Sequence, residues 1–304
     1  MAISRHQLVK ELEPGLNALF GLEYKRYDNQ HAEIYTSESS DRAFEEEVML
    51  SGFGNASVKS EGSGVAFDNA QESYSARYTH ETVALAFAIT EEAIEDNLYD
   101  KISSRYTKAL ARSMSNAKQV KAAAPLNNGL PSVDGFDSGD GVSLFNTSHT
   151  TVSGTNVKNT LTTQADLNET SLEQAMIDIS GMTDERGLRI AAKAVKMIVP
   201  SANQFAAERL MKSQGRTGTA DNDINALGSM GMIPQGYRVN NYLTDTDSFD
   251  IITDVPNGMK MFTRAPLTTA MEGDFDTGNV RYKARERYSF GVSDFRGIFG
   301  VEGA

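Results

Sequence analysis

The chain has no cysteine among its 304 residues. This absence excludes disulfide-stabilised scaffolds, thiolate zinc sites and cysteine nucleophiles, and it fits a reducing compartment. No run of 18 apolar residues is present, so no segment is expected to span a membrane. The N-terminal sequence MAISRHQLVKELEPGL also lacks the apolar core of a secretory signal peptide.

The sequence motifs of common enzyme classes are missing as well. There is no phosphate-binding P-loop and no dinucleotide-binding fingerprint. Ser148 and His149 are adjacent, but they lie in a polar loop without the G-x-S-x-G elbow of serine hydrolases. The histidines do not have the spacing of metal ligands; they are His6, His31, His80 and His149. We therefore expect no catalytic residue, no cofactor and no metal.

The composition is that of a soluble globular protein, with 39% hydrophobic and 23% charged residues. The length allows one large domain or two ordinary ones. The formal net charge of −12 argues against sequence-specific duplex binding as the main role, because such proteins present basic surfaces to the phosphate backbone.

One acidic segment resembles a calcium-binding loop. Asp221, Asp223 and Asn225 have the required spacing. The pattern fails at Ala226, where glycine is required, and at Met232, where glutamate is required. We therefore expect no metal in this loop.

A second acidic segment, residues 91–96, ends the most regularly patterned stretch of the chain, RYTHETVALAFAITEEAIEDN. Paired carboxylates can serve acid–base catalysis, but no histidine or nucleophile is tied to these acids by spacing. Thr90 is a suitable N-cap, and Glu91 and Glu92 would complement the positive end of a helix dipole. We interpret the acids as the start of a helix.

The residues around these acids predict a strand followed by a long helix. In the strand, bulky apolar residues alternate with alanines between Val83 and Ile89. The helix is expected over residues 91–124, ending before Pro125, and at 1.5 Å per residue it would be roughly 50 Å long. Its apolar stripe consists of Ile94, Leu98, Ile102, Tyr106, Leu110 and Met114.

The region before this strand predicts an arm and a hairpin. Residues 1–40 indicate a partly helical arm broken by Pro14 and Gly15, and residues 41–50 indicate a helix. Residues 51–76 are rich in glycine and serine, with strand-like pieces on both sides of SEGSG. They predict an extended two-stranded hairpin or a long loop, and such a loop usually has a functional or interacting role.

The remaining residues mix helices and strands without βαβ regularity, which favours the α+β class. A short strand is expected at VSLF, a helix after a capping box from Thr170 to Glu173, and a strand over residues 193–200. A further helix is expected over residues 201–213, with Ser201 and Gln204 in the capping positions, followed by several strands.

Basic residues alternate along the last long strand, at Arg281, Lys283, Arg285 and Arg287. They share one face, opposite Tyr282, Ala284 and Tyr288. This face is either simply solvated or a basic stripe that meets another subunit or nucleic acid.

The order of these elements resembles the Hong Kong 97-type major capsid proteins of tailed phages, and the sequence is similar to the Mu-like branch of major head proteins. The resemblance covers nearly the whole chain. It is carried by LEPGLNALFGLEY, SDRAFEEEVML, QESYSARYTHETVALAFAITEEAIEDNLYD, QADLNETSLEQAMIDI, TADNDINALGSMGMIPQGY and TGNVRYKARERYSFGVSD.

The resemblance implies a division into named regions. Residues 1–50 would form an N-terminal arm, and residues 51–78 a hairpin called the E-loop. A peripheral domain would comprise residues 79–165 and 276–304, with a spine helix at about 91–124. An axial domain would comprise residues 166–275.

The resemblance also implies self-assembly into pentamers and hexamers of an icosahedral shell that encloses double-stranded DNA, in a virion assembled in the host cytoplasm. Candidate inter-subunit contacts are Lys59 and Glu61 in the E-loop together with Arg281, Lys283, Arg285 and Arg287. No Lys59 crosslink and no N-terminal processing are expected. Separate scaffold, portal and decoration proteins are further partners. The alternatives are an encapsulin-like compartment shell, a tail-tube protein and a soluble enzyme.

Overall fold

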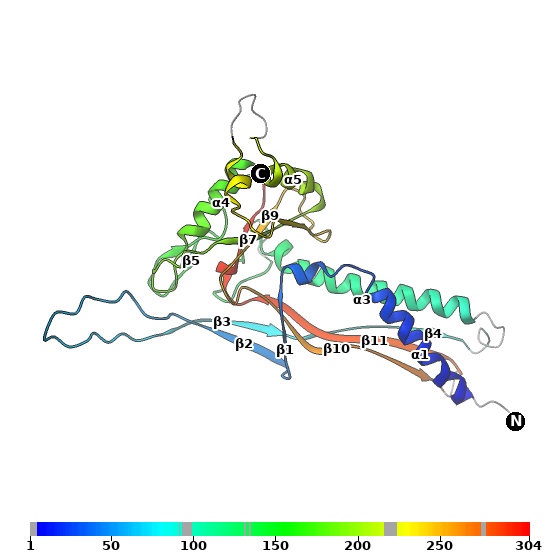
Figure 1. The fold of residues 1–304 in the computed structure, drawn as a ribbon. Helices are drawn as coiled ribbons and strands as arrows, with labels where there is room; N and C mark the ends of the chain where they lie inside the picture. The colour runs from blue at the N-terminus through cyan, green and yellow to red at the C-terminus, as the bar shows by residue number, and fades with distance from the viewer. Residues whose placement is uncertain are drawn as a thin grey trace.

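The computed structural model describes residues 5–90, 92, 99–130, 132–133, 135–215, 224–274 and 278–304. An elongated body carries the long helix α3, and a compact body stands on one end of it (Figure 1). A hairpin extends outward past the compact body, away from the end of the elongated body at which the N-terminus lies. No helix within the described ranges is long and apolar enough to cross a bilayer.

The elongated body is built on a four-stranded sheet in the order β1-β10-β11-β4. Its central strands, β10 and β11, pair antiparallel over almost their whole length, with Met259 opposite Val292 and Gly273 opposite Val280. The elements of this body are α1 (Arg5–Tyr24), η1 (Gln30–Glu33), β1 (Thr36–Ser39), β4 (Glu81–Ile89), α3 (Tyr99–Asn128), β10 (Met259–Gly273) and β11 (Val280–Val292).

One face of this sheet packs on the two helices. Tyr282 and Ala284 of β11 are buried with Leu110 and Met114 of α3 and with Phe20 of α1. Side chains alternate along a strand, so Lys283, which lies between Tyr282 and Ala284, points away from the helices. The predicted alternation of β11 is therefore confirmed, with the basic residues on the outer side.

The compact body contains a second sheet in the order β12-β9-β7-β8, covered by short helices. Its elements are β5 (His149–Thr150), β6 (Asn156–Val157), α4 (Glu169–Gly181), β7 (Ala194–Val199), η2 (Ser201–Asn203), α5 (Gln204–Lys212), α6 (Ala226–Met230), β8 (Tyr237–Val239), β9 (Phe249–Thr253), η3 (Phe295–Gly297) and β12 (Ile298–Val301). The predicted apolar face of α4 is buried in this core, at Leu172, Ala175, Met176 and Ile179. The α+β class is confirmed.

The hairpin consists of β2 (Phe44–Leu50) and β3 (Glu72–Thr79), which pair antiparallel. Residues 51–71 between them form the long tip, with a turn at residues 61–62. Of the two alternatives predicted for residues 51–76, the long loop is the one observed over residues 51–71: the strand-like pieces on both sides of SEGSG form no strand, and the paired strands are β2 and β3. The helix predicted over residues 41–50 is wrong. Glutamates favour helices in isolation, whereas here Glu45 bonds Ser40 and Glu47 bonds Lys260, which are contacts that only the alternation of a strand provides.

Two helices also run past predicted breaks. α1 continues through Pro14, and α3 passes Pro125 and ends at Asn128, beyond the predicted end at 124. Proline costs a helix one hydrogen bond and some strain, but burial of neighbouring residues offsets this cost. Leu16 of α1 and Leu126 of α3 are both buried in hydrophobic clusters.

The predicted capping residues were wrong as well. The box of α4 pairs Asn168 with Ser171, two positions before the expected box. α5 begins at Gln204 after η2, and no side chain caps it. The sequence VSLF forms no strand; Ser143 makes one isolated bridge to Asp137.

The predicted boundary at 275–276 separates two strands that pair along their length. β10 lies in the sheet of the elongated body with β11, and β12 lies in the sheet of the compact body with β9. The chain therefore passes back into the compact body after β11, which the sequence pattern did not indicate.

Candidate assembly surfaces

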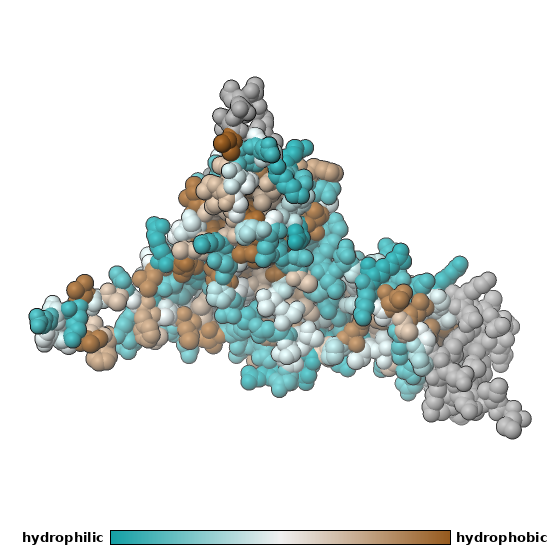
Figure 2. All heavy atoms as spheres, viewed as in Figure 1, coloured by the Kyte–Doolittle hydropathy of each residue, from teal (hydrophilic) through white to brown (hydrophobic). Residues whose placement is uncertain are grey.

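The tip of the hairpin exposes large apolar side chains. Val58 is 97% exposed and Phe67 is 98% exposed, and Phe53 and Val65 are also largely in solvent. Figure 2 shows hydrophobic atoms at the far end of the hairpin, away from both bodies. Val58 and Val65 lie nearest in sequence to the turn at residues 61–62, whereas Phe53 and Phe67 adjoin Gly54 and Asp68, closer to the compact body. Gathered apolar exposure of this kind marks a surface that another molecule covers.

The hairpin is fastened to the compact body near its middle. The Asp68 carboxylate accepts a hydrogen bond from the Gly54 amide across the hairpin, at 2.7 Å. It also accepts two from the Arg186 guanidinium, at 2.9 and 3.1 Å. The Gly54 amide, followed by the Asn69 amide and Arg186, holds the pKa of Asp68 below its usual value. This contact sets the direction in which the tip leaves the molecule.

A buried ion pair lies where the hairpin base meets the compact body. Ser73 of β3 donates to Glu185, and Glu185 pairs with Arg296 at 2.8 Å, with both charged side chains 3% exposed. Arg296 also pairs with Asp294. Burial raises the pKa of Asp294, although Arg296 opposes this shift. Breaking such a pair is costly because it leaves an uncompensated buried charge.

A second polar cluster joins β2 to the elongated body. Lys260 is nearly buried and pairs with Glu47 at 2.6 Å and with Glu38 at 3.2 Å. Glu47 also accepts a hydrogen bond from Ser293. Burial lowers the pKa of Lys260, but the hydrogen bonds and charges of the two glutamates outweigh it and raise that pKa overall. The hairpin base is thus fixed to both bodies.

The outer face of the large sheet carries the predicted basic stripe. Strand register places Lys283 beside Ala86 and Arg285 beside Ala84 of β4. Lys283 also lies beside Ala270 of β10, so small side chains flank the stripe. Arg281 pairs with Asp274 at the end of the sheet. The side chains directly beside Lys283 are therefore small on both neighbouring strands.

The structure does not bring all the candidate contact residues together within one chain. Lys59 and Glu61 lie at the tip of the hairpin, whereas the basic stripe lies on β11 at the other end of the molecule (Figure 1). The residues that fasten the hairpin were not found from the sequence, because no spacing pattern relates positions such as Asp68 and Arg186.

A family model described as phage capsid protein matches residues 73–301. The chain belongs to the phage capsid protein family. A search of curated proteins found no match to this capsid protein.

Solved structures with the same fold include three particle shells. The virus-like particle from Pyrococcus furiosus has a TM-score of 0.53 and 10% identity, covering 95% of this chain and 98% of that chain. The capsid of Myoviridae phage XM1 has a TM-score of 0.55 and 12% identity, covering 89% of each chain. The capsid of an empty GTA particle has a TM-score of 0.54 and 16% identity, covering 90% of this chain and 89% of that chain. The capsid protein therefore has the Hong Kong 97-type fold.

Three histidines of this capsid protein, His31, His80 and His149, occupy structural positions. His31 bonds Gln119, and burial lowers its pKa to about 4. His80 lies between Ser40 and Ser289. His149 bonds Asp140 at 2.6 Å and Asn159 at 3.0 Å, with its ring stacked on Phe295; His6 lies in α1. Within the described ranges, no group of three or more histidines and acids could hold a metal.

The structure describes only part of each of the two acidic segments. Of residues 91–96, Glu92 is described and exposed, and the others lie outside the described residues. Asp221 and Asp223 lie outside them too. Asn225 is buried, caps α6 through the Gly228 amide and donates to the Leu210 carbonyl at 2.6 Å. In the capsid protein this asparagine therefore has a structural role.

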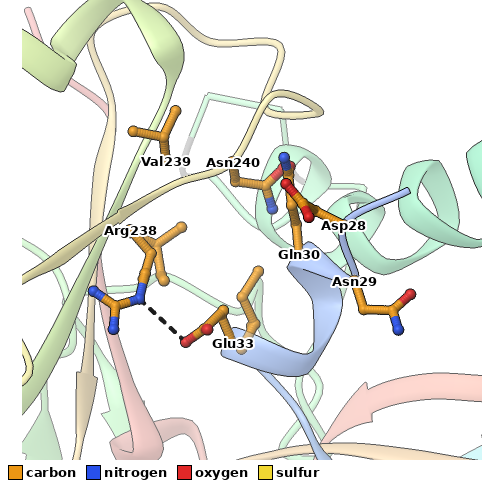
Figure 3. A pocket seen from close by; sticks show the side chains of 9 residues that line it. Asp28, Asn29, Gln30, Glu33, Arg238, Val239 and Asn240 are labelled. Carbon is orange, nitrogen blue, oxygen red and sulfur yellow. Dashed lines mark ion pairs between the residues drawn. The ribbon is translucent and has the colours of Figure 1, made fainter. Parts of the chain in front are cut away.

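A pocket of about 300 Å³ lies between η1 and the compact body. Figure 3 shows Glu33 from η1 facing Arg238 from β8, with their ion pair at 3.5 Å. Lys196 pairs with the same carboxylate at 2.6 Å and, ahead of Arg238, lowers the pKa of Glu33. These contacts fasten the segment after α1 to the compact body of the capsid protein.

Proposed function

We propose that this protein is the major subunit of a phage head and that its copies form pentamers and hexamers that tile an icosahedral shell around double-stranded DNA. The observation that carries the proposal is the hairpin, which extends away from both bodies and exposes Val58 and Val65 near its tip. A neighbouring subunit would cover them. Heterologous contacts between identical chains close into rings and shells, and many modest contacts add up.

The regions of the fold take the roles that the resemblance implies. Residues 1–50 are the N-terminal arm, and residues 51–78 are the E-loop. Apart from α1, η1 and β1, which belong to the arm, the elongated body is the peripheral domain with α3 as its spine, and the compact body is the axial domain at the centre of each capsomer. The quoted segments, such as QADLNETSLEQAMIDI, support placement in the Mu-like branch.

Lys59 and Glu61 at the hairpin tip and the basic stripe of β11 are the proposed inter-subunit contacts. Their separation within one chain supports this role, because each then needs a partner from another copy. The stripe consists of Arg281, Lys283, Arg285 and Arg287. Lys283→Glu/Arg285→Glu should prevent shell formation while the subunit stays folded; intact shells would contradict the contact.

The role in the virion is structural, and assembly takes place in the host cytoplasm, with separate scaffold, portal and decoration proteins as partners. The primary test is electron microscopy of purified particles after nuclease treatment, together with their absorbance ratio. Closed shells that protect double-stranded DNA are the expected result. Tubes, or particles filled only with protein, would contradict the proposal.

One observation favours a second candidate, a shell that encloses protein. The fold similarity to the virus-like particle from Pyrococcus furiosus extends over 98% of that particle's chain. The same nuclease experiment separates the two candidates, because a protein-filled shell would contain a cargo polypeptide and no protected DNA.

The hairpin itself is tested by deleting residues 56–66. This segment contributes nothing to either core, so the shortened chain should remain soluble and melt at nearly the same temperature. Shell formation should fail, because the exposed apolar contact is lost. Normal shells from the shortened chain would show that the hairpin tip is not an assembly contact.

A further inference from the structure

After Asp100 in its first turn, the helix α3 has charges of one sign only, in a protein of the opposite net charge. From residue 101 to residue 128 it contains no aspartate or glutamate. It contains six basic residues: Lys101, Arg105, Lys108, Arg112, Lys118 and Lys121. The chain as a whole has a net charge of −12. A surface that is only solvated usually mixes both signs, so this segment calls for a partner.

The basic residues near the compact body are neutralised within the protein. Lys118 pairs with the buried Glu286 of β11 at 3.2 Å, and Lys121 pairs with Glu81 of β4. By contrast, Arg105, Lys108 and Arg112 are exposed. None of these three forms an ion pair with any residue in the described ranges.

These three residues form one line along the helix, here called the α3 stripe. Their spacing of three and four residues places successive charges about one helical turn apart, roughly 5 Å. The opposite side of α3, at Leu110 and Met114, is buried in the core. Side chains beside the stripe are small or neutral, at Ala109, Ser113 and Asn116.

We infer that the α3 stripe contacts the phosphate backbone of the enclosed DNA. This inference rests on the proposed function and specifies which surface meets the DNA. A line of exposed cations without acids suits a polyanion of any sequence. A protein partner would instead favour an apolar centre of several side chains, whereas the stripe has beside it one partly exposed aromatic ring, Tyr106, which is 53% exposed and packs on Phe87 with ring centroids 5.8 Å apart.

The fold supplies a second reason for choosing this surface. The sheet lies between the α3 stripe and the basic stripe of β11, so the two basic surfaces face opposite sides of one layer. A shell wall has one side toward its contents. The β11 stripe has alanines beside Lys283 and Arg285 and is the proposed contact with another subunit, and this leaves the α3 stripe for the DNA.

The test is the salt dependence of binding to a mixed-sequence 30-base-pair duplex, measured by fluorescence anisotropy between about 20 and 150 mM NaCl. Each phosphate contact contributes about 0.9 to the slope of log K against log salt. Arg105→Gln/Lys108→Gln/Arg112→Gln should therefore reduce the slope by about 2 to 3 per subunit. Glutamine favours helices nearly as well as lysine and arginine, so α3 should be preserved.

A matched variant removes the same charge elsewhere. Arg189, Lys193 and Arg209 are exposed residues of the compact body, and none forms an ion pair with a described residue. Arg189→Gln/Lys193→Gln/Arg209→Gln should change the slope by less than about 1. Equal losses in the two variants, or an unchanged slope in the α3 variant, would overturn the inference.

Ultraviolet crosslinking in DNA-filled particles locates the contact directly. Nucleotide adducts are expected in peptides that contain residues 105–112, and adducts confined to residues 281–287 would overturn the inference. An α3 variant that no longer forms shells but binds DNA normally would show that the stripe meets another subunit. Failure of the wild-type chain to form shells would count against the proposed function alone, because the duplex measurement does not depend on assembly.

Discussion

Asp250 should make the stability of this protein fall as pH rises. Asp250 lies on β9, is 2% exposed, and its Oδ1 has no hydrogen-bond partner within the described ranges. Burial raises its pKa from 3.8 to about 8, and the charge of Asp245 adds to the shift. The carboxyl group is therefore protonated in the native state at neutral pH, whereas the unfolded chain releases the proton.

The magnitude follows from linkage. Between about pH 4 and pH 8 the native state holds one proton more than the unfolded state, so the free energy of unfolding falls by about 1.4 kcal/mol per pH unit. Across the whole window the loss is on the order of 5 kcal/mol. No stability is lost below the pKa of Asp250 in the unfolded state, and the full amount is lost above its pKa in the native state. Asp250→Asn removes the titration and hence this dependence.

The measurement is urea unfolding of the unassembled subunit at pH 5, 6, 7, 8 and 9, for the wild type and Asp250→Asn. Other titrating groups are common to both proteins, and their contributions cancel in the difference. The variant should gain stability relative to the wild type as pH rises, whatever its constant offset. A flat difference for Asp250→Asn would refute the reasoning.

Three further predictions concern contacts described above. Gly297→Ala should lower the free energy of unfolding by about 1 to 3 kcal/mol, because a Cβ there would lie 2.3 Å from the Gly258 Cα. The control is Gly181→Ala, where nothing lies within 4 Å of the added Cβ. Equal melting temperatures for the two variants would contradict the prediction. Arg186→Ala should speed amide exchange in residues 52–70 with little change in global stability, because an ion pair at the surface contributes less than about 1 kcal/mol; unchanged exchange would mean that other contacts fix the hairpin. Glu185→Gln should lower the free energy of unfolding by about 1 to 3 kcal/mol, because Arg296 keeps Asp294 but loses the charge of its other buried partner, and thermal melting that matches the wild type would disprove this.

Local periodicity made the core of this fold predictable. The alternation along β11 and the apolar stripe of α4 are properties of neighbouring residues, and both are packed as expected. The long loop of residues 51–71 was also predictable from its glycine and serine content, whereas the strands that carry it, β2 and β3, lie outside the strand-like pieces around SEGSG.

Tertiary contacts decided the elements that were predicted wrongly. Residues 44–50 favour a helix by their glutamates, but Glu47 finds Lys260 more than two hundred positions away, and only a strand allows this. Pro14 breaks a helix in isolation, yet Leu16 and Phe20 bury enough surface to keep α1 continuous. The basic stripe of β11 could be found from the sequence, whereas the Asp68–Arg186 contact could not, because its partners lie 118 positions apart.

The strand order has a consequence for how the chain is made. β11 lies in the centre of the large sheet, between β10 and β4, and β12 joins the sheet of the compact body through β9. Neither sheet can close until residues 280–301 have left the ribosome. Both hydrophobic cores of a nascent chain therefore remain incomplete until then, and fragments released early by the ribosome cannot form the elongated body or the compact body. Synthesis itself would then keep incomplete chains out of the shell.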